Sequence, residues 1–162
     1  MKEEFVKKEF KKIEKQEIFV KTINGKEYVI KSVKDSDYKE GNINAHIRQI
    51  RLLRKNLKGN IPKTSLSKKE INREKYLIIS CEKIEGKLIN LTKRDLDKKL
   101  KTGMLKLLKK GYVLDFYGSK NFIRDKNRRI YYIDSRMPLF SKKSNEGNRF
   151  EISKKVTKEL LK

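Results

Sequence analysis

The stretch that most constrains this chain is residues 112–134, where polar residues are set among β-branched and aromatic neighbours. Residues 122–123 and 130–133 have the composition of short strands, and the polar stretch between them has the composition of a turn. We therefore predict a β-hairpin, with Asn121 just before its first strand and Asp134 at the end of its second.

The predicted hairpin would bring Asn121 and Asp134 close together, and Asp115, in the loop just upstream, can reach the same place. Two carboxylates and an amide oxygen are ligands suited to Mg²⁺, which proteins usually bind through one or two carboxylates together with substrate phosphates. These residues therefore predict a magnesium site. The alternative is a β-hairpin in which the same Asp and Asn residues only form turns.

The chain is short and strongly basic. Its 162 residues and 19.3 kDa fit one domain that is long enough for a real core. The formal net charge of +23 and the pI near 10.0 predict attraction to polyanions: nucleic acid, nucleotides, acidic proteins or an anionic membrane surface. Because the lysines are scattered along the chain, the alternative is a solvated Lys-rich surface of the kind found in thermophiles.

Several classes of protein are excluded by the rarity of cysteine and histidine. Cys81 is the only cysteine, so the chain has no intrachain disulfide and no cysteine-based zinc site. His46 is the only histidine, which excludes a histidine-rich metal site. No apolar run approaches the roughly 18 residues of a membrane-spanning helix, and the N-terminus lacks the apolar core of a signal peptide, so we expect a cytoplasmic protein.

The first third of the chain predicts helices and a hairpin. Residues 2–16 form a basic amphipathic helix, which either docks on the domain or lies on an anionic membrane. Residues 18–33 form a hairpin whose Asn24-Gly25 supplies the positive φ angles of a type I′ turn. Apolar residues spaced by three and four predict a helix over 43–57, ended by Gly59-Asn60.

The rest of the chain predicts a strand and two further helices. Residues 76–80 read as a buried strand. Thr92–Asp95 is close to a capping box, and the leucine spacing that follows predicts a helix closing at Gly111. Residues 141–148 have the composition of an exposed loop, and residues 152–161 predict a short terminal helix.

The succession of Asp115, Asn121, a hairpin and Asp134 resembles the catalytic and metal-binding loops of the protein-kinase-like fold. The resemblance implies that Asp115 orients or deprotonates the acceptor hydroxyl, and that Asn121 and Asp134 hold the metal. Asn121 comes one residue later than the kinase spacing. The other departures are Val113-Leu114 in place of His-Arg and Ser135-Arg136 in place of Phe-Gly.

Motifs upstream follow the kinase order. Tyr28-Val-Ile-Lys31 is similar to the third-strand motif of kinases, which implies that Lys31 contacts the α- and β-phosphates of ATP. The strand leading into Glu82 is similar to a kinase hinge, which implies that the Glu82 carbonyl and the Ile84 amide bind the adenine. No Gly-x-Gly-x-x-Gly precedes Lys31, so a phosphate-covering loop is either absent or replaced by residues 22–26.

The helix predicted over 43–57 stands where kinases have the helix whose Glu pairs with the strand lysine. Here the candidates are His46 and Gln49, and neither is a carboxylate; Glu40 lies just upstream. His46 falls on the apolar side of the helix, where a packed, hydrogen-bonded core histidine is the alternative to a catalytic role.

The resemblance covers residues 17–138 and implies an α+β protein with a minimal protein-kinase-like fold. It divides into a small antiparallel-sheet N-lobe, about residues 17–82, and a truncated helical C-lobe, about residues 87–138. Residues 1–16 would then be an N-terminal basic amphipathic helix, and residues 139–162 a basic loop with a C-terminal helix. In this the chain resembles small atypical kinases of the Rio, Bud32 and lipopolysaccharide-core type, which also trim the C-lobe.

The implied function is that of an ATP- and Mg²⁺-dependent phosphotransferase, an atypical kinase whose acceptor the sequence does not identify. Two alternatives stay open. One is a catalytically inactive pseudokinase that binds nucleotide or nothing and acts through its basic surface. The other is a basic nucleic-acid-binding protein without kinase ancestry, for which no recognised binding signature is present.

Overall fold

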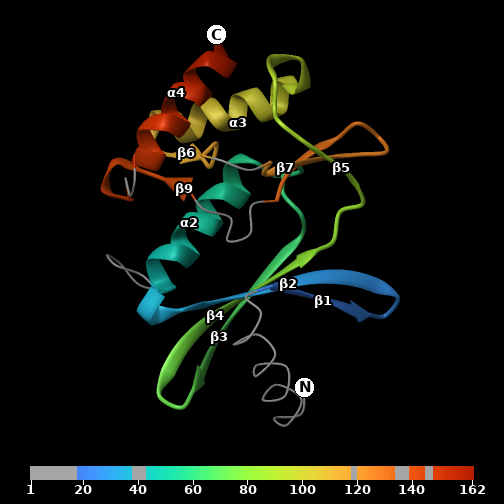
Figure 1. Ribbon diagram of the computed structural model, residues 1–162, viewed down its shortest axis with the longest axis vertical. Helices are drawn as coiled ribbons and strands as arrows, with labels where there is room; N and C mark the ends of the chain where they lie inside the picture. The colour runs from blue at the N-terminus through green and yellow to red at the C-terminus, as the bar shows by residue number, and fades with distance from the viewer. Residues whose placement is uncertain (1–17, 38–42, 118–119, 134–138, 145–147) are drawn as a thin grey trace. The chain divides into compact units, whose positions relative to one another are not determined.

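A computed structural model describes residues 18–37, 43–117, 120–133, 139–144 and 148–162 (Figure 1). These residues form a mixed α+β protein with three α-helices and antiparallel sheets. They fall into two compact units. Unit 1 contains the described residues up to Asn44 together with Lys63–Lys83, and unit 2 contains Ala45–Pro62 together with the described residues from Ile84 onward.

Unit 1 is built on a four-stranded antiparallel sheet in the order β1-β2-β4-β3. Its strands are β1 (Ile18–Ile23), β2 (Lys26–Lys34), β3 (Thr64–Ile71) and β4 (Glu74–Glu82), and a 3-10 turn, η1 (Asp35–Asp37), follows β2. Asn24 and Gly25 have φ angles of 51° and 76°, which confirms the predicted tight turn between β1 and β2.

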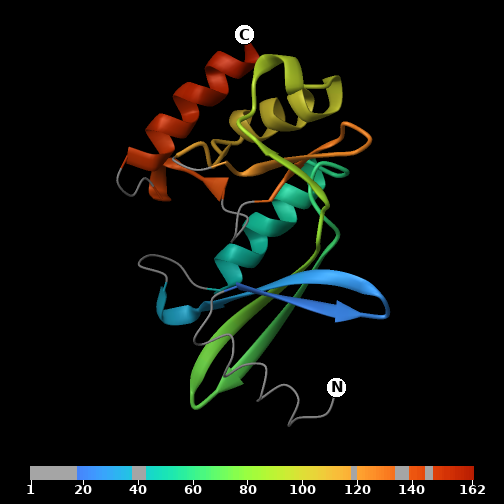
Figure 2. The ribbon, with the colours of Figure 1, turned by 45° about the vertical axis from the view of Figure 1, so that its right-hand side comes forward.

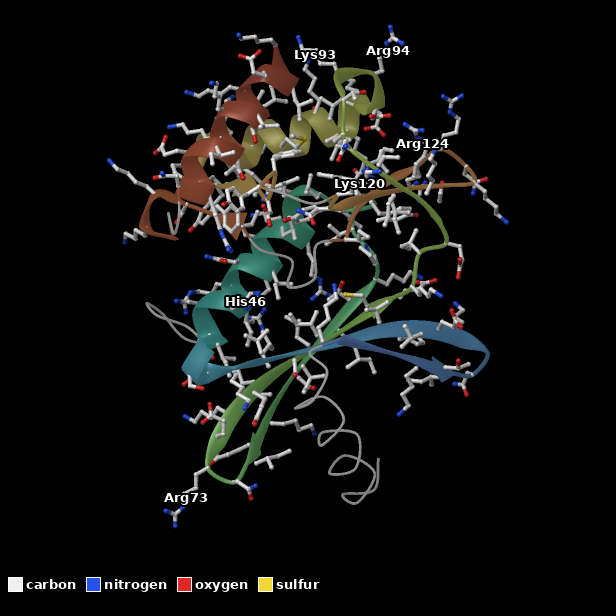
Figure 3. The ribbon with its side chains drawn as sticks, in the orientation of Figure 1. His46, Arg73, Lys93, Arg94, Lys120 and Arg124 are labelled. Atoms are coloured by element: carbon white, nitrogen blue, oxygen red, sulfur yellow. The ribbon has the colours of Figure 1, made fainter. Side chains whose placement is uncertain are left out.

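The hairpin between β3 and β4 is not predicted by the sequence. Asn72 and Arg73 take φ angles of 50° and 66° at its tip, and Figure 3 shows the Arg73 side chain there. Asn-Arg is a weak turn signal compared with Asn-Gly, and β3, Thr-Ser-Leu-Ser-Lys-Lys-Glu-Ile, is mostly exposed and polar. This strand therefore depends on its pairing with β4 rather than on its own composition.

Each face of the unit 1 sheet carries apolar side chains. Strand register places Val33 opposite Leu77, and both are buried together with Ile79. On the other face Ile30 and Tyr76 form a second buried cluster. The alternation along β2 and β4 follows from the two-residue period of a strand.

Unit 2 begins with most of helix α2 (Ile43–Asn56), which confirms the helix predicted over 43–57. The buried side chains of this segment within unit 2 recur at helical spacing: Ile47, Ile50, Leu53 and Leu57. Gly59, with φ of 88°, ends the helical segment, and the Asn60 amide donates to the Leu57 carbonyl at 2.8 Å.

Helix α3 (Lys98–Lys109) begins later than the predicted cap. Thr92 and Asp95 close a 3-10 turn, η2 (Lys93–Asp95), in which the Asp95 carboxylate accepts from the Thr92 amide at 2.8 Å. The residue that caps α3 is Asp97, whose carboxylate accepts from the Leu100 amide at 2.7 Å. The predicted C-terminal signal is confirmed, because Gly111 has φ of 86° and follows the helix directly.

Gly103 allows α3 to pack closely on the end of α2. A Cβ at this position would overlap the Asn56 carbonyl oxygen, and it would lie 2.6 Å from a methyl group of Leu57. The helix backbone can therefore approach this turn only if residue 103 has no side chain.

Two small sheets and a terminal helix complete unit 2 (Figures 1 and 2). The first sheet has the order β5-β7-β8, and the second pairs β6 with β9. Helix α4 packs on β6, β9 and α3 and begins three residues before its predicted start. The bounds are β5 (Gly86–Ile89), β6 (Val113–Leu114), β7 (Phe122–Asp125), β8 (Ile130–Tyr132), β9 (Leu139–Phe140), η3 (Lys142–Ser144) and α4 (Arg149–Leu161).

The hairpin predicted around residues 122–133 is confirmed as β7 and β8, with Phe122 opposite Tyr132. The predicted helix over 2–16 lies outside the described residues, as do Glu40 and Asp134. Within the described part of the chain, no helix has the length and apolarity needed to cross a membrane.

Candidate functional site

The candidate site is the loop between β6 and β7 in unit 2. Strand β6 is buried at both of its residues, and Asp115 follows it directly. The backbone N–H of Asp115 donates to the hydroxyl of Tyr132 at 3.1 Å. Tyr132 lies on β8 and is fully buried, so the start of the loop is tied to the core of unit 2.

The carboxylate of Asp115 organises its own turn. Its Oδ1 accepts a hydrogen bond from the Tyr117 amide at 2.8 Å, which is the bond of an Asx turn. The second oxygen, Oδ2, is not used in this bond. Asp115 is half-buried, so its carboxylate can meet a substrate from solvent.

Asn121 is joined to Asp115 and to the end of β8. Its Nδ2 donates to the Asp115 carbonyl at 3.0 Å, and its own carbonyl accepts from the Ile133 amide at 2.9 Å. The structure therefore brings Asp115 and Asn121 together and holds Asn121 beside the residue that precedes Asp134. Because the amide nitrogen is used as a donor, Oδ1 is the atom that Asn121 can offer to a cation.

Helix α4 contributes a residue that the sequence analysis missed. The Phe116 amide donates to Ser153 Oγ at 3.0 Å, and Ser153 is completely buried on α4. The Phe116 ring stacks on Phe122 with centroids 5.5 Å apart, and Phe122 contacts the Tyr132 ring at 5.3 Å. No local pattern around Ser153 signals this role, because its partner is 37 residues away in the chain.

A pocket of about 160 Å³ opens at this loop. It contains both polar residues of the site, Asp115 and Asn121, and one cation, Lys120, which Figure 3 labels. The volume is small beside the 300–1,000 Å³ of typical ligand pockets, so it fits a phosphate or a short side chain rather than a whole nucleotide. The other residues that line it are Ile89, Asn90, Leu91, Phe116, Phe122 and Val156.

A larger pocket of about 370 Å³ lies in unit 1. It contains none of the residues predicted for the site, and its charged lining is mixed in sign. Its residues are Asp35, Ile43, Asn44, Lys68, Lys69, Glu70, Lys75 and Tyr76. We place the candidate site at the smaller pocket because Asp115 and Asn121, which are joined by a part-buried hydrogen bond, both line it.

Lys31 lies in unit 1, on β2 opposite Ile79, and is only 6% exposed. It shares its sheet face with Cys81. Burial raises the pKa of the Cys81 thiol, and this is opposed by a hydrogen bond with Thr64 and by the positive charge of Lys31. The positive charge of Lys31 therefore lies on the same sheet face as the Cys81 thiol.

The predicted hinge lies where the chain passes from unit 1 to unit 2. Glu82 is the last residue of β4, and its amide donates to the Lys63 carbonyl at 2.9 Å. Lys83 bonds to Glu27 through both its amide and its ammonium group, at 3.0 Å and 2.9 Å. Ile84 is the first residue of this part of unit 2.

The other predicted residues are placed as follows. His46 is buried on α2, as expected for a residue on its apolar side, and Gln49 is half-buried. Asp134, the second predicted metal ligand, lies outside the described residues. Within the described ranges, no three His, Cys, Asp or Glu side chains are grouped as a metal site.

Comparison with models of known protein families finds no match for this chain. Comparison with curated proteins finds no match either. The function is therefore inferred from the site itself.

Proposed function

We propose that this protein is an ATP- and Mg²⁺-dependent phosphotransferase with a minimal protein-kinase-like fold. The main support is the 3.0 Å hydrogen bond from Asn121 Nδ2 to the Asp115 carbonyl. Together with the bond between the Ile133 amide and the Asn121 carbonyl, it joins an acid, an amide and the chain leading into Asp134. Kinases place their catalytic Asp, metal-binding Asn and metal-binding Asp in the same order.

In this proposal Asp115 orients the acceptor hydroxyl and accepts its proton as the oxygen attacks the γ-phosphorus of ATP. We assign this role to Oδ2, because Oδ1 accepts from the Tyr117 amide. Asn121 Oδ1 and Asp134 would hold Mg²⁺, which when bound neutralises charge on the phosphates. The γ-phosphoryl group is transferred to the acceptor oxygen, and ADP is the leaving group. The proton of the acceptor hydroxyl remains on Asp115 until it is released to solvent.

The nucleotide contacts in this proposal are those that the resemblance to kinases implies. The ammonium of Lys31 would contact the α- and β-phosphates. The Glu82 carbonyl, with the Ile84 amide of unit 2, would bind the adenine edge. We propose that the reaction takes place in the cytoplasm, where ATP and Mg²⁺ are supplied.

A nucleotide-binding pseudokinase is the second candidate. Helix α2, Ile-Asn-Ala-His-Ile-Arg-Gln-Ile-Arg-Leu-Leu-Arg-Lys-Asn, has no Asp or Glu. It therefore offers no carboxylate to position Lys31, which active kinases require for efficient transfer. This alternative predicts ATP binding without turnover.

The first test is a thermal-shift titration with ATP, with and without Mg²⁺. A ligand that binds only the folded state stabilises it by about 2.7 kcal/mol at one hundred times its Kd, which corresponds to a rise in Tm of about 5 °C or more. We expect this rise for the wild-type protein with Mg²⁺ and its loss in Asn121→Ala and Asp134→Ala. The matched control is Asn127→Ala, an exposed Asn in the turn of the same hairpin.

The two candidates separate when ATP hydrolysis is measured on the same samples. Asp115→Asn keeps an oxygen that can accept from the Tyr117 amide but removes the charge. If the enzyme is active, this variant keeps the ATP-dependent rise in Tm and loses hydrolysis. Binding without any wild-type hydrolysis would favour the pseudokinase, and the absence of a shift at millimolar ATP would reject both.

A further inference from the structure

Three segments of unit 2 place exposed cations on one surface. We call this surface the basic cluster: Lys58, Arg94, Lys99, Arg128 and Arg129, all of which are exposed. They come from the turn after α2, from η2 and the first turn of α3, and from the turn between β7 and β8. In both Figure 1 and Figure 2 the β7–β8 turn, η2 and the start of α3 lie on the same side of the unit, and Figure 3 shows Arg94 and Arg124 there.

The contacts between these segments are specific. Arg124 on β7 forms an ion pair with Asp95, the last residue of η2, which joins β7 to the segment before α3. The Nζ atom of Lys99 lies 2.8 Å from the position that a Cβ would take on Gly59. The turn after α2 is tied to β8, because the buried Asn60 accepts from the Tyr132 amide at 2.7 Å and donates from its side chain to the Ile130 carbonyl at 3.0 Å.

The carboxylates nearby do not cancel this charge. Residues 93–99 and 124–129 contain eight Lys or Arg and three Asp. Each of the three Asp residues already serves a local bond: Asp95 accepts from Thr92 and pairs with Arg124, Asp97 accepts from the Leu100 amide, and Asp125 accepts from the amides of Asn127 and Arg129. Because the Lys and Arg residues outnumber these three carboxylates, the surface keeps a positive potential.

An apolar and aromatic face adjoins the cluster. The strand register places Leu88, Ile123 and Tyr131 in one row across β5, β7 and β8, on the face opposite the buried Phe122 and Tyr132. Leu88 is 48% exposed, and Ile123 and Tyr131 are half-buried. Tyr131 follows Arg129 by two residues in the chain, and its hydroxyl is the main cause of a raised pKa of the Arg129 guanidinium, so the two side chains lie near one another.

We propose that this surface binds single-stranded nucleic acid, with the basic cluster on the phosphate backbone and the Tyr131 face under the bases. Cations that follow a backbone, next to an aromatic side chain on which bases stack, are the two parts of a single-strand binding surface. Anionic membranes also bind cations that lie beside apolar side chains, but only a single strand uses an aromatic ring as a platform for its bases, so the response to Tyr131 substitutions distinguishes the two. The inference goes beyond the phosphotransferase activity and does not depend on it.

The test is fluorescence anisotropy with labelled 20-nucleotide single strands of RNA and DNA, repeated over a series of salt concentrations. The test variant is Lys99→Gln, Arg128→Gln, Arg129→Gln. The matched control is Lys55→Gln, Arg48→Gln, Arg51→Gln, which removes one Lys and two Arg from the exposed side of α2 in the same unit. We expect the test variant to bind at least about tenfold more weakly. The slope of log K against log salt concentration should fall in magnitude by about 2, because each phosphate contact to a single strand contributes roughly 0.7 to that slope. The control should stay within about threefold of wild type.

Substitutions of Tyr131 distinguish the contribution of base stacking to binding from the contribution of charge. We expect Tyr131→Ala to weaken single-strand binding about tenfold, and Tyr131→Phe to keep it, because the ring and not the hydroxyl stacks on a base. Duplex DNA and anionic vesicles are the comparison ligands, and neither should respond to Tyr131→Ala. Lys58→Gln with Arg94→Gln is the second cluster variant, to be used if the triple variant does not fold.

Three outcomes would overturn the inference. The first is an equal loss of affinity in the test and control variants, which would mean that only net charge matters. The second is unchanged binding in both cluster variants. The third is binding of duplex DNA or vesicles as tight as that of single strands. Each readout is made without ATP, so a failure here leaves the phosphotransferase proposal untouched.

Discussion

At the scale of single residues, Tyr132 couples the candidate site to the core of unit 2. Its hydroxyl accepts from the Asp115 amide at 3.1 Å, and its ring, fully buried, contacts Phe122. We expect Tyr132→Phe to lower the free energy of unfolding by about 1–2 kcal/mol, because the Asp115 N–H loses its partner. Urea denaturation measures this loss, with the half-buried Tyr131→Phe as the control that should change stability by less than about 0.5 kcal/mol. Equal effects in the two variants would contradict the role given to Tyr132.

The same scale explains why the single cysteine should be inert. Cys81 is buried, and burial raises the pKa of its thiol above the ordinary value, against the opposing effects of Thr64 and Lys31. Only the thiolate attacks a disulfide reagent. We therefore expect modification of Cys81 at pH 8 to be at least about tenfold slower in the folded protein than in guanidinium. A rate equal to that of the unfolded chain would show that this strand opens readily.

At the scale of elements, the packing of α3 on the end of α2 depends on Gly103. Alanine is the better helix former, so an exposed Gly→Ala change within a helix would stabilise it by up to about 1 kcal/mol. Here the added Cβ would overlap the Asn56 carbonyl, and we expect Gly103→Ala to destabilise the protein by about 2 kcal/mol or more. Thermal unfolding of this variant is compared with that of the exposed Thr102→Ala on the same helix, which should be near neutral. A stabilised Gly103→Ala would mean that the two elements are not in close contact.

The link between η2 and β7 should make stability depend on pH. Burial of the Asp95 carboxyl favours its neutral form, but hydrogen bonds from Thr92 and the Arg124 guanidinium outweigh this and lower its pKa. A lowered folded pKa means that the stabilisation is complete above the unfolded value of about 3.9 and is lost as the pH falls through the folded pKa. We expect the stability difference between wild type and Asp95→Asn, measured by urea denaturation, to be largest near pH 6 and to shrink below pH 4. A difference that stays constant down to about pH 2.5 would contradict this assignment.

At the scale of the whole molecule, the net charge of +23 acts against the compact state. Raising the salt concentration from about 10 mM to about 100 mM shortens the Debye length from about 30 Å to about 10 Å and screens this repulsion. We therefore expect Tm to rise with NaCl, and to rise much less with an uncharged osmolyte of equal osmolality. A fall in Tm would show that ion pairs such as Arg124–Asp95 contribute more than the self-repulsion costs.

The sequence by itself determined the elements whose signals are local. The i, i+3, i+4 spacing of α2, the Asn24-Gly25 turn, the closure of α3 before Gly111 and the hairpin of β7 and β8 all follow from patterns within about fifteen residues. The order in which Asp115 and Asn121 follow one another also comes from the sequence.

Only the tertiary structure decided how the loop between β6 and β7, which carries Asp115, is held in place. The bonds from the Asp115 and Phe116 amides join residues 17 and 37 positions apart, to Tyr132 and Ser153. The partners meet because β8 and α4 pack on β7, β6 and β9, and no local propensity records such a meeting. Two other features also depend on a neighbouring element. The polar segment β3 is a strand because it pairs with β4, and residue 103 must be glycine because α3 contacts the end of α2 there.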